Sequence, residues 1–199
     1  MLARTLEVQI SRLVELGFHD GAGLEAPEFA DRAGELHEVF DDHADSQPVL
    51  VASASFVGTA KLTEQIDRED GKPETVIHAA DLDRYEPIPE IQVPETNFYL
   101  LTGFNREPET RNLSPIDARL ILAERGRSPI TTDEGLAVFA QWPECVWPND
   151  GFSLAGSTRG DKRVPAIWVS KQRPKLGWCY LGAPHTWLAT ASCEGRRVN

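Results

Sequence analysis

The sequence lacks the segments and motifs that would assign the protein to a membrane or to a nucleotide-dependent reaction. Its 199 residues contain no run of about 18 apolar residues, so we expect no membrane span. Three glycine motifs are also missing: the phosphate-binding patterns GxxxxGK followed by Ser or Thr and GxGxxG, and the nucleophile motif GxSxG. The sequence therefore predicts no cofactor, and whether the protein is an enzyme stays open.

Cysteine is also scarce. The three cysteines lie at positions 145, 179 and 193 and never form a CxxC pair. Near the N-terminus, Glu7 interrupts the apolar stretch that a signal peptide would need. An odd number of cysteines without an export signal favours reduced thiols, and we expect a cytoplasmic protein.

Cys179, His185 and Cys193 raise the question of a zinc site. We expect the strands around residues 182–184 to form a hairpin, which would place His185 roughly 10 Å and Cys193 roughly 16 Å from Cys179. Zinc ligands lie within about 2.0–2.3 Å of one ion, so the sequence predicts no metal site. Because cysteine is usually buried, we expect packed rather than reactive thiols.

Charge is distributed unevenly along the chain. The net charge is −11, yet residues 151–199 hold eight Lys and Arg against two acids, which gives +6. The first 150 residues then hold 12 basic and 29 acidic residues, which gives −17. Such a split fits two surfaces that attract each other, or a basic face that binds an anion. Duplex nucleic acid is not an expected partner, because the overall field would repel it.

Apolar periodicity predicts helices early in the chain and strands after them. Leucines recur at helical spacing over residues 3–16, and a second apolar stripe spans 27–40. Short apolar runs at 48–53 and 98–103 predict buried strands.

Two further helices have clear start signals. One begins at Ser114, which is followed by Pro, and the other at Thr131 in a Thr-Thr-Asp-Glu capping box. In the first of these helices we expect Ile116, Leu120 and Ile121, with Ala123, to face the core.

After residue 149 the pattern changes to short apolar runs separated by turn residues. The runs cover 152–156, 164–170, 176–181 and 186–192, with turns at about 158–161, 171–174 and 182–185. This spacing is typical of an antiparallel meander. We therefore predict an α+β fold, with helices packed on a mostly antiparallel sheet and a C-terminal β-meander. One domain, 1–199, would comprise a helical segment (1–45), a mixed α/β segment (46–148) and the meander (149–199).

The C-terminal segment also holds the candidate site residues. Its tryptophans either build the core or form a flat apolar wall for a ligand, with basic residues at the rim. His185, in a turn beside Trp187, is the candidate acid or base. The candidate ligand-binding residues are Arg159, Lys162, Lys171, Arg173, Lys175, Trp178 and Trp187.

These cations fall into two groups, because successive turns of a meander lie at opposite ends of the strands. Lys171, Arg173 and Lys175 flank one turn, and we favour this group because Arg173 has the forked geometry that suits phosphate or carboxylate. Arg159 and Lys162, with His185, could form a second group at the other end of the sheet.

Four stretches carry a family resemblance: GRSPITTDEG (126–135), RVPAIWVSK (163–171), PKLGWCYLGAPHTWL (174–188) and ASC (191–193). With them the chain resembles an actinobacterial family of uncharacterised proteins, a domain of unknown function, which implies no particular activity. Three hypotheses follow: binding of an anionic small molecule on the basic, aromatic sheet; an enzyme that uses His185 on the same surface; or a protein-interaction module anchored by Trp and Arg. The oligomeric state stays open.

Overall fold

The structure, a computed structural model, describes residues 5–64 and 79–199. Helices pack on mostly antiparallel sheets, which confirms the predicted α+β class. Within those described ranges, no helix is both long and apolar enough to cross a membrane.

The N-terminal part is helical. It comprises α1 (Leu6–Glu15), α2 (Phe18–Gly21), α3 (Ala26–Gly34) and α4 (His37–Asp42). The helix α1 begins where the Thr5 hydroxyl accepts a hydrogen bond from the Val8 N–H. The single helix expected over 27–40 is interrupted after Gly34, which gives two shorter helices. Their apolar stripes nevertheless face inward, with Phe29 fully buried.

A three-stranded antiparallel sheet follows these helices. A short turn of helix, η1 (Ala44–Ser46), leads into β1 (Val49–Ala52), which pairs with the central strand β3 (Phe98–Thr102). Every residue of β1 and β3 is buried, as the continuous apolar runs predict. The last strand, β11 (Gly195–Arg197), pairs with the other edge of β3. The chain's end thus lies beside a strand from the middle of the sequence.

Several short elements connect the larger ones. They are α5 (Ala54–Val57), α6 (Thr59–Thr63), α7 (Ala79–Leu82), β2 (Glu86–Pro87), η2 (Pro108–Thr110), β4 (Ser128–Pro129), η3 (Pro143–Cys145), β6 (Ser157–Thr158) and β10 (Ser192–Cys193). Antiparallel pairs join β2 to β6 and β4 to β10. Each pair ties the middle of the chain to the C-terminal segment.

The helix α8 (Pro115–Glu124) starts at the predicted Ser114 cap but buries a different face. Ile116 is 46% exposed and Leu120 is 64% exposed, so the expected core face was wrong. Ala118 and Leu122 are fully buried instead. The helix carries apolar residues on two sides, and the side with Pro115, Ala118 and Leu122 is the one that packs.

The helix α9 (Thr132–Gln141) is buried along most of its length. Its capping box is present as predicted: the Thr131 hydroxyl accepts from the Glu134 N–H, and the Glu134 carboxylate accepts from the Thr131 N–H. A Cβ added at Gly135 would overlap the Leu154 side chain. This glycine therefore lets α9 approach the C-terminal segment closely.

The C-terminal sheet has the order β8-β7-β5-β9. Its strands are β5 (Gly151–Ser153), β7 (Arg163–Ser170), β8 (Arg173–Tyr180) and β9 (Leu188–Thr190). Strands β5, β7 and β8 are antiparallel neighbours, which confirms the C-terminal meander. Lys171 and Gln172, both with positive φ, make the two-residue turn between β7 and β8.

The hairpin expected around residues 182–184 was wrong. After β8 the chain crosses the end of the sheet, and β9 pairs with β5 in parallel at the opposite edge. The carbonyls of Leu181 and His185 accept hydrogen bonds from Ile116 and Asn112 instead of from a facing strand. The distances on which the zinc argument rested therefore do not apply.

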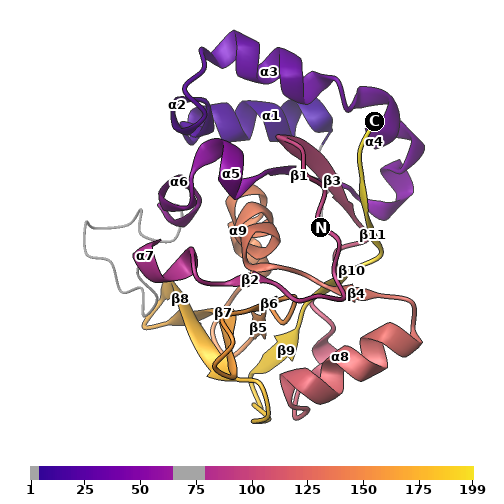
Figure 1. The fold of residues 1–199 in the computed structure, drawn as a ribbon, viewed down its shortest axis with the longest axis vertical. Helices are drawn as coiled ribbons and strands as arrows, with labels where there is room; N and C mark the ends of the chain where they lie inside the picture. The colour runs from indigo at the N-terminus through magenta and orange to yellow at the C-terminus, as the bar shows by residue number, and fades with distance from the viewer. Residues whose placement is uncertain (1–4, 65–78) are drawn as a thin grey trace.

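One apolar core joins the three segments of the chain. It includes Leu13 of α1, Leu100 of β3, Val138 of α9 and Ile167 of β7, all fully buried. Figure 1 shows α9 between the β1–β3 strands and the C-terminal sheet, with α8 beside β9. A smaller cluster that includes Cys179 covers the other face of the C-terminal sheet.

Candidate functional site

The candidate residues of the C-terminal sheet divide between its two faces. Trp178 packs against the main core, opposite Pro165 in the strand register. Its neighbour Gly177 faces the other way, because a Cβ there would overlap the Trp168 ring. Trp168 lies on that second face with Trp187, their ring centroids 5.8 Å apart. Trp178 and Trp187 therefore do not form one wall.

Two arginines are held over aromatic rings at the edge of the first face. The Arg163 guanidinium lies 4.6 Å from the centroid of Trp178, and that of Arg159 lies 5.8 Å from the centroid of Tyr85. Asp161 joins them, with one carboxylate oxygen 3.0 Å from Arg159 Nε and 3.7 Å from Arg163 Nε. We call this group the arginine row: Tyr85, Arg159, Asp161, Arg163 and Trp178.

The strands explain how the arginine row is assembled. Arg163 opens β7 opposite Tyr180 of β8, so Trp178 is its diagonal neighbour on the same face. Arg159 follows β6, which pairs with β2 directly after Tyr85. Tyr180, 54% exposed, extends the group, with its ring centroid 5.1 Å from that of Trp178.

Tyr85 places a buried hydroxyl group at the arginine row. The residue is 7% exposed, and the Arg159 guanidinium lies close to its hydroxyl oxygen. Among the residues that the structure describes, the hydroxyl donates to no acceptor. Burial raises the pKa of Tyr85, and the nearby Arg159 guanidinium acts in the opposite direction. The phenol therefore stays protonated near neutral pH and keeps a donor available.

The turn between β7 and β8 holds the group that the sequence favoured. Lys171 is exposed in that turn, Arg173 lies opposite Ser170, and Lys175 lies opposite Trp168. This end of the hairpin is the one remote from Arg163 and Tyr180. Lys162 belongs to the other end, where it is exposed and its carbonyl accepts a hydrogen bond from the Leu181 N–H.

His185 belongs to the second face. Its ring centroid lies 5.7 Å from that of Trp187, and its Nε2 atom is buried without a hydrogen-bond partner in the described part of the chain. The expected grouping of His185 with Arg159 and Lys162 is not what the geometry gives. Arg159 contacts Tyr85 and Asp161, whereas His185 contacts Trp187.

The three cysteines are buried, and burial raises the pKa of each thiol to about 12. Cys179 and Cys193 belong to different apolar clusters. Across residues 5–64 and 79–199, no group of three His, Cys, Asp or Glu residues could hold a metal ion.

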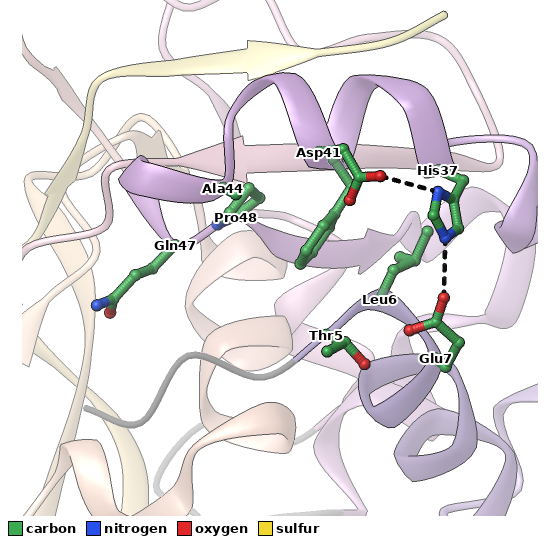
Figure 2. Close-up of a pocket in the computed structure, with 9 residues that line it drawn as sticks. Thr5, Leu6, Glu7, His37, Asp41, Ala44, Gln47 and Pro48 are labelled. Atoms are coloured by element: carbon green, nitrogen blue, oxygen red, sulfur yellow. Dashed lines mark hydrogen bonds and ion pairs between the residues drawn. The ribbon is translucent and has the colours of Figure 1, made fainter.

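A separate cavity of about 360 Å³ lies between α1 and α4. At its rim, His37 lies 3.0 Å from a Glu7 oxygen through Nε2 and 3.3 Å from an Asp41 oxygen through Nδ1, as Figure 2 shows. Leu6 and Phe40 supply apolar lining. All three side chains are more than half exposed, and exposed pairs of this kind contribute about 0–1 kcal/mol. We assign this cavity no ligand.

Sequence reasoning missed Tyr85 and the partnership of the two arginines. Tyr85 lies far from Arg159 in the chain, and only the β2–β6 pairing, two residues long, brings them together. The signal available in the sequence was weak: a tyrosine beside Glu86-Pro87, before an extended proline-containing stretch. Arg163 was recognisable as a cation but not as the partner of Trp178.

Comparison with known proteins adds a family but no activity. No curated protein and no solved structure matches the chain. A protein family matches residues 12–199, which is nearly the whole length. The chain therefore belongs to a family of unknown function, DUF5701.

Proposed function

We propose that the protein binds a small anionic molecule at the arginine row. The observation that carries the proposal is the pair of guanidiniums, each held over an aromatic ring, that share a single carboxylate. Arginine forks match phosphate and carboxylate oxygens in paired hydrogen bonds. Stacking on Tyr85 and Trp178 holds the forks in place before binding, which lowers the entropy lost on binding.

Local charge supports an anion in this position. Arg159 and Arg163 supply two positive charges against the one negative charge of Asp161. The hydroxyl of Tyr85, which donates to no acceptor among the described residues, adds a neutral donor. The exposed ring of Tyr180 offers a surface on which a planar ligand would stack.

The test is ligand-dependent melting at constant ionic strength, with inorganic phosphate, a nucleotide and an aromatic carboxylate as probes. For a true ligand at a hundredfold excess over its Kd, stabilisation is about 2.7 kcal/mol. We expect Arg159→Gln and Arg163→Gln to abolish the shift. Lys171→Gln, in the turn at the opposite end of the same hairpin, is the matched control and should keep it.

Two results would contradict this assignment. If Lys171→Gln removes the shift and the row variants keep it, the site is the group that the sequence favoured. If no probe shifts the melting temperature while added salt does, the cations only balance the acidic part of the chain. The interaction-module hypothesis would then gain, and Trp147 is its strongest anchor: it is 45% exposed, with the Arg106 guanidinium 3.7 Å from its ring centroid.

The enzyme hypothesis keeps His185 as its candidate acid or base. The His185 ring lies on the second face of the C-terminal sheet, apart from the arginine row. A reaction on an anion bound at the arginine row would therefore need another proton donor. Turnover of a probe identified by the melting assay would support an enzyme, and the variant His185→Gln would test this side chain.

A further inference from the structure

The carboxylate of Asp161 occupies the position between the two guanidiniums of the arginine row. One of its oxygens lies 3.0 Å from Arg159 Nε and 3.7 Å from Arg163 Nε. The other oxygen accepts a hydrogen bond from the Arg163 N–H at 3.2 Å. An external oxygen that contacts both Nε atoms would have to lie where the first of these oxygens lies. The chain thus supplies an anion of its own to the site proposed above.

Asp161 is also the more accessible partner of its pair with Arg159. The Asp161 side chain is 37% exposed, whereas the Arg159 side chain is 15% exposed. The part of the pair that solvent reaches is therefore mainly the carboxylate, which lowers the positive charge that an arriving anion meets. An anion that is to contact both arginines must take the place of this carboxylate.

The turn that carries Asp161 allows its side chain to leave this position at low cost. Gly160, with φ of 81°, and Lys162, with φ of 65°, lie on either side of Asp161. A Cβ added at Gly160 would meet open space, so this point of the turn is not packed against other residues. Exposed ion pairs contribute little to stability, and the 3.7 Å contact to Arg163 is long for such a pair. A stronger anion can therefore replace these contacts.

We propose that Asp161 is an internal competitor at the anion site, and that the ligand carries two negative charges at one end, as a phosphate monoester does. This inference rests on the function proposed above. Because Asp161 is tethered to the site, it competes at an effective concentration on the order of millimolar. A ligand with a single carboxylate exchanges one carboxylate for another and loses translational freedom on binding. A phosphate monoester brings a second charge and three oxygens to the two guanidinium forks, so it displaces Asp161.

The variant Asp161→Asn tests this competition. Its amide oxygen can still accept from the Arg163 N–H, while the negative charge is removed. The probes are phenyl phosphate, which is doubly charged at about pH 8, and benzoate, which is singly charged. Affinities are measured by NMR titration at constant ionic strength. The Arg163 amide resonance is followed, because its hydrogen bond to Asp161 breaks when the carboxylate leaves.

In the unaltered protein we expect phenyl phosphate to bind at least about tenfold more tightly than benzoate. Asp161→Asn should bind each probe about fivefold more tightly than the unaltered protein does, because the cost of moving the carboxylate aside is the same for both ligands. Asp31→Asn, at an exposed position of α3, removes the same charge elsewhere and should change neither affinity. Arg159→Gln, added to Asp161→Asn, should abolish binding.

Three results would overturn the inference and leave anion binding at the arginine row intact. Equal affinities of Asp161→Asn and the unaltered protein would mean that Asp161 does not compete. Weaker binding by Asp161→Asn would mean that the carboxylate positions the arginines. A gain for phenyl phosphate that is the square of the gain for benzoate would mean that Asp161 repels the ligand without being displaced.

The remaining results concern the ligand class and the site itself. Benzoate binding as tight as that of phenyl phosphate would contradict a doubly charged ligand. The same gain in Asp31→Asn as in Asp161→Asn would trace the effect to overall charge and would also overturn the inference. If neither probe binds to the unaltered protein or to Asp161→Asn, the proposed function fails together with this inference.

Discussion

Asp133 offers a prediction whose size and pH dependence both follow from its position. It occupies the second residue of α9, partly buried beside Glu134. Burial first, then the carboxylates of Glu134 and Asp83, raise the pKa of Asp133 from 3.8 to about 6. The folded state thus disfavours the ionised carboxyl, and Asp133→Asn should stabilise the protein near neutral pH.

The magnitude comes from the two pKa values. A difference of about two corresponds to about 3 kcal/mol of unfolding free energy. Partial exposure of the side chain reduces this figure, and so does the loss of a favourable charge in the first turn of the helix, which contributes about 0.3–1 kcal/mol. We therefore expect Asp133→Asn to gain on the order of 1–2 kcal/mol above about pH 7.

The sign of the pH dependence is fixed. Between about pH 4 and pH 6 the folded carboxyl holds a proton that the unfolded chain has released, so stability falls as pH rises. Below about pH 4 both states are protonated and the advantage of Asn disappears. Urea unfolding of both proteins across this range measures the difference. An Asn variant that is less stable at neutral pH, or a difference that does not change with pH, would refute the argument.

Two further predictions concern buried groups. Arg196→Ala should lower the free energy of unfolding in urea by about 3–5 kcal/mol, because it leaves the fully buried Glu134 carboxylate without its guanidinium partner. The control Arg197→Ala, at the more exposed neighbour, should lower it far less. Equal losses would contradict the importance of the buried pair. In the folded protein the three thiols should react slowly with a thiol reagent at about pH 8, since their pKa values of about 12 leave little thiolate. After denaturation all three should react. Rapid labelling of the folded protein would contradict their burial.

The sequence predicted individual helices, strands and turns better than it predicted which of them lie side by side. The capping box at Thr131, the buried run of β3 and the turn at Lys171 follow from local chemistry, and each lies where it was expected. The partner of β9 did not follow, because a short loop such as 181–187 is compatible with a hairpin as well as with a crossing to the far edge. Hydrogen bonds from residues 112 and 116 favour the crossing, and no local pattern encodes them.

For the candidate site too, the sequence predicted the residues better than their arrangement in space. Arg159, Lys162 and Trp178 were recognisable because cations and aromatics gather in one stretch of sequence. Strand alternation assigns each side chain to a face only once the register is known, so Trp178 and Trp187 were grouped although they lie on opposite faces. The same holds for α8, where two apolar stripes were available and the choice depended on what packs against the helix.

The charge split between the two parts of the chain now has two separate explanations. Arg196 lies in β11 beside β3 and pairs with Glu134, so one C-terminal cation does neutralise an acid of the first 150 residues. Arg197 donates a hydrogen bond to the His43 ring, which is not an acid. Arg159 and Arg163 instead share Asp161, an acid of their own segment, and keep an excess of positive charge. Mutual attraction therefore accounts for Arg196, whereas for the cations of the arginine row we propose an external anion.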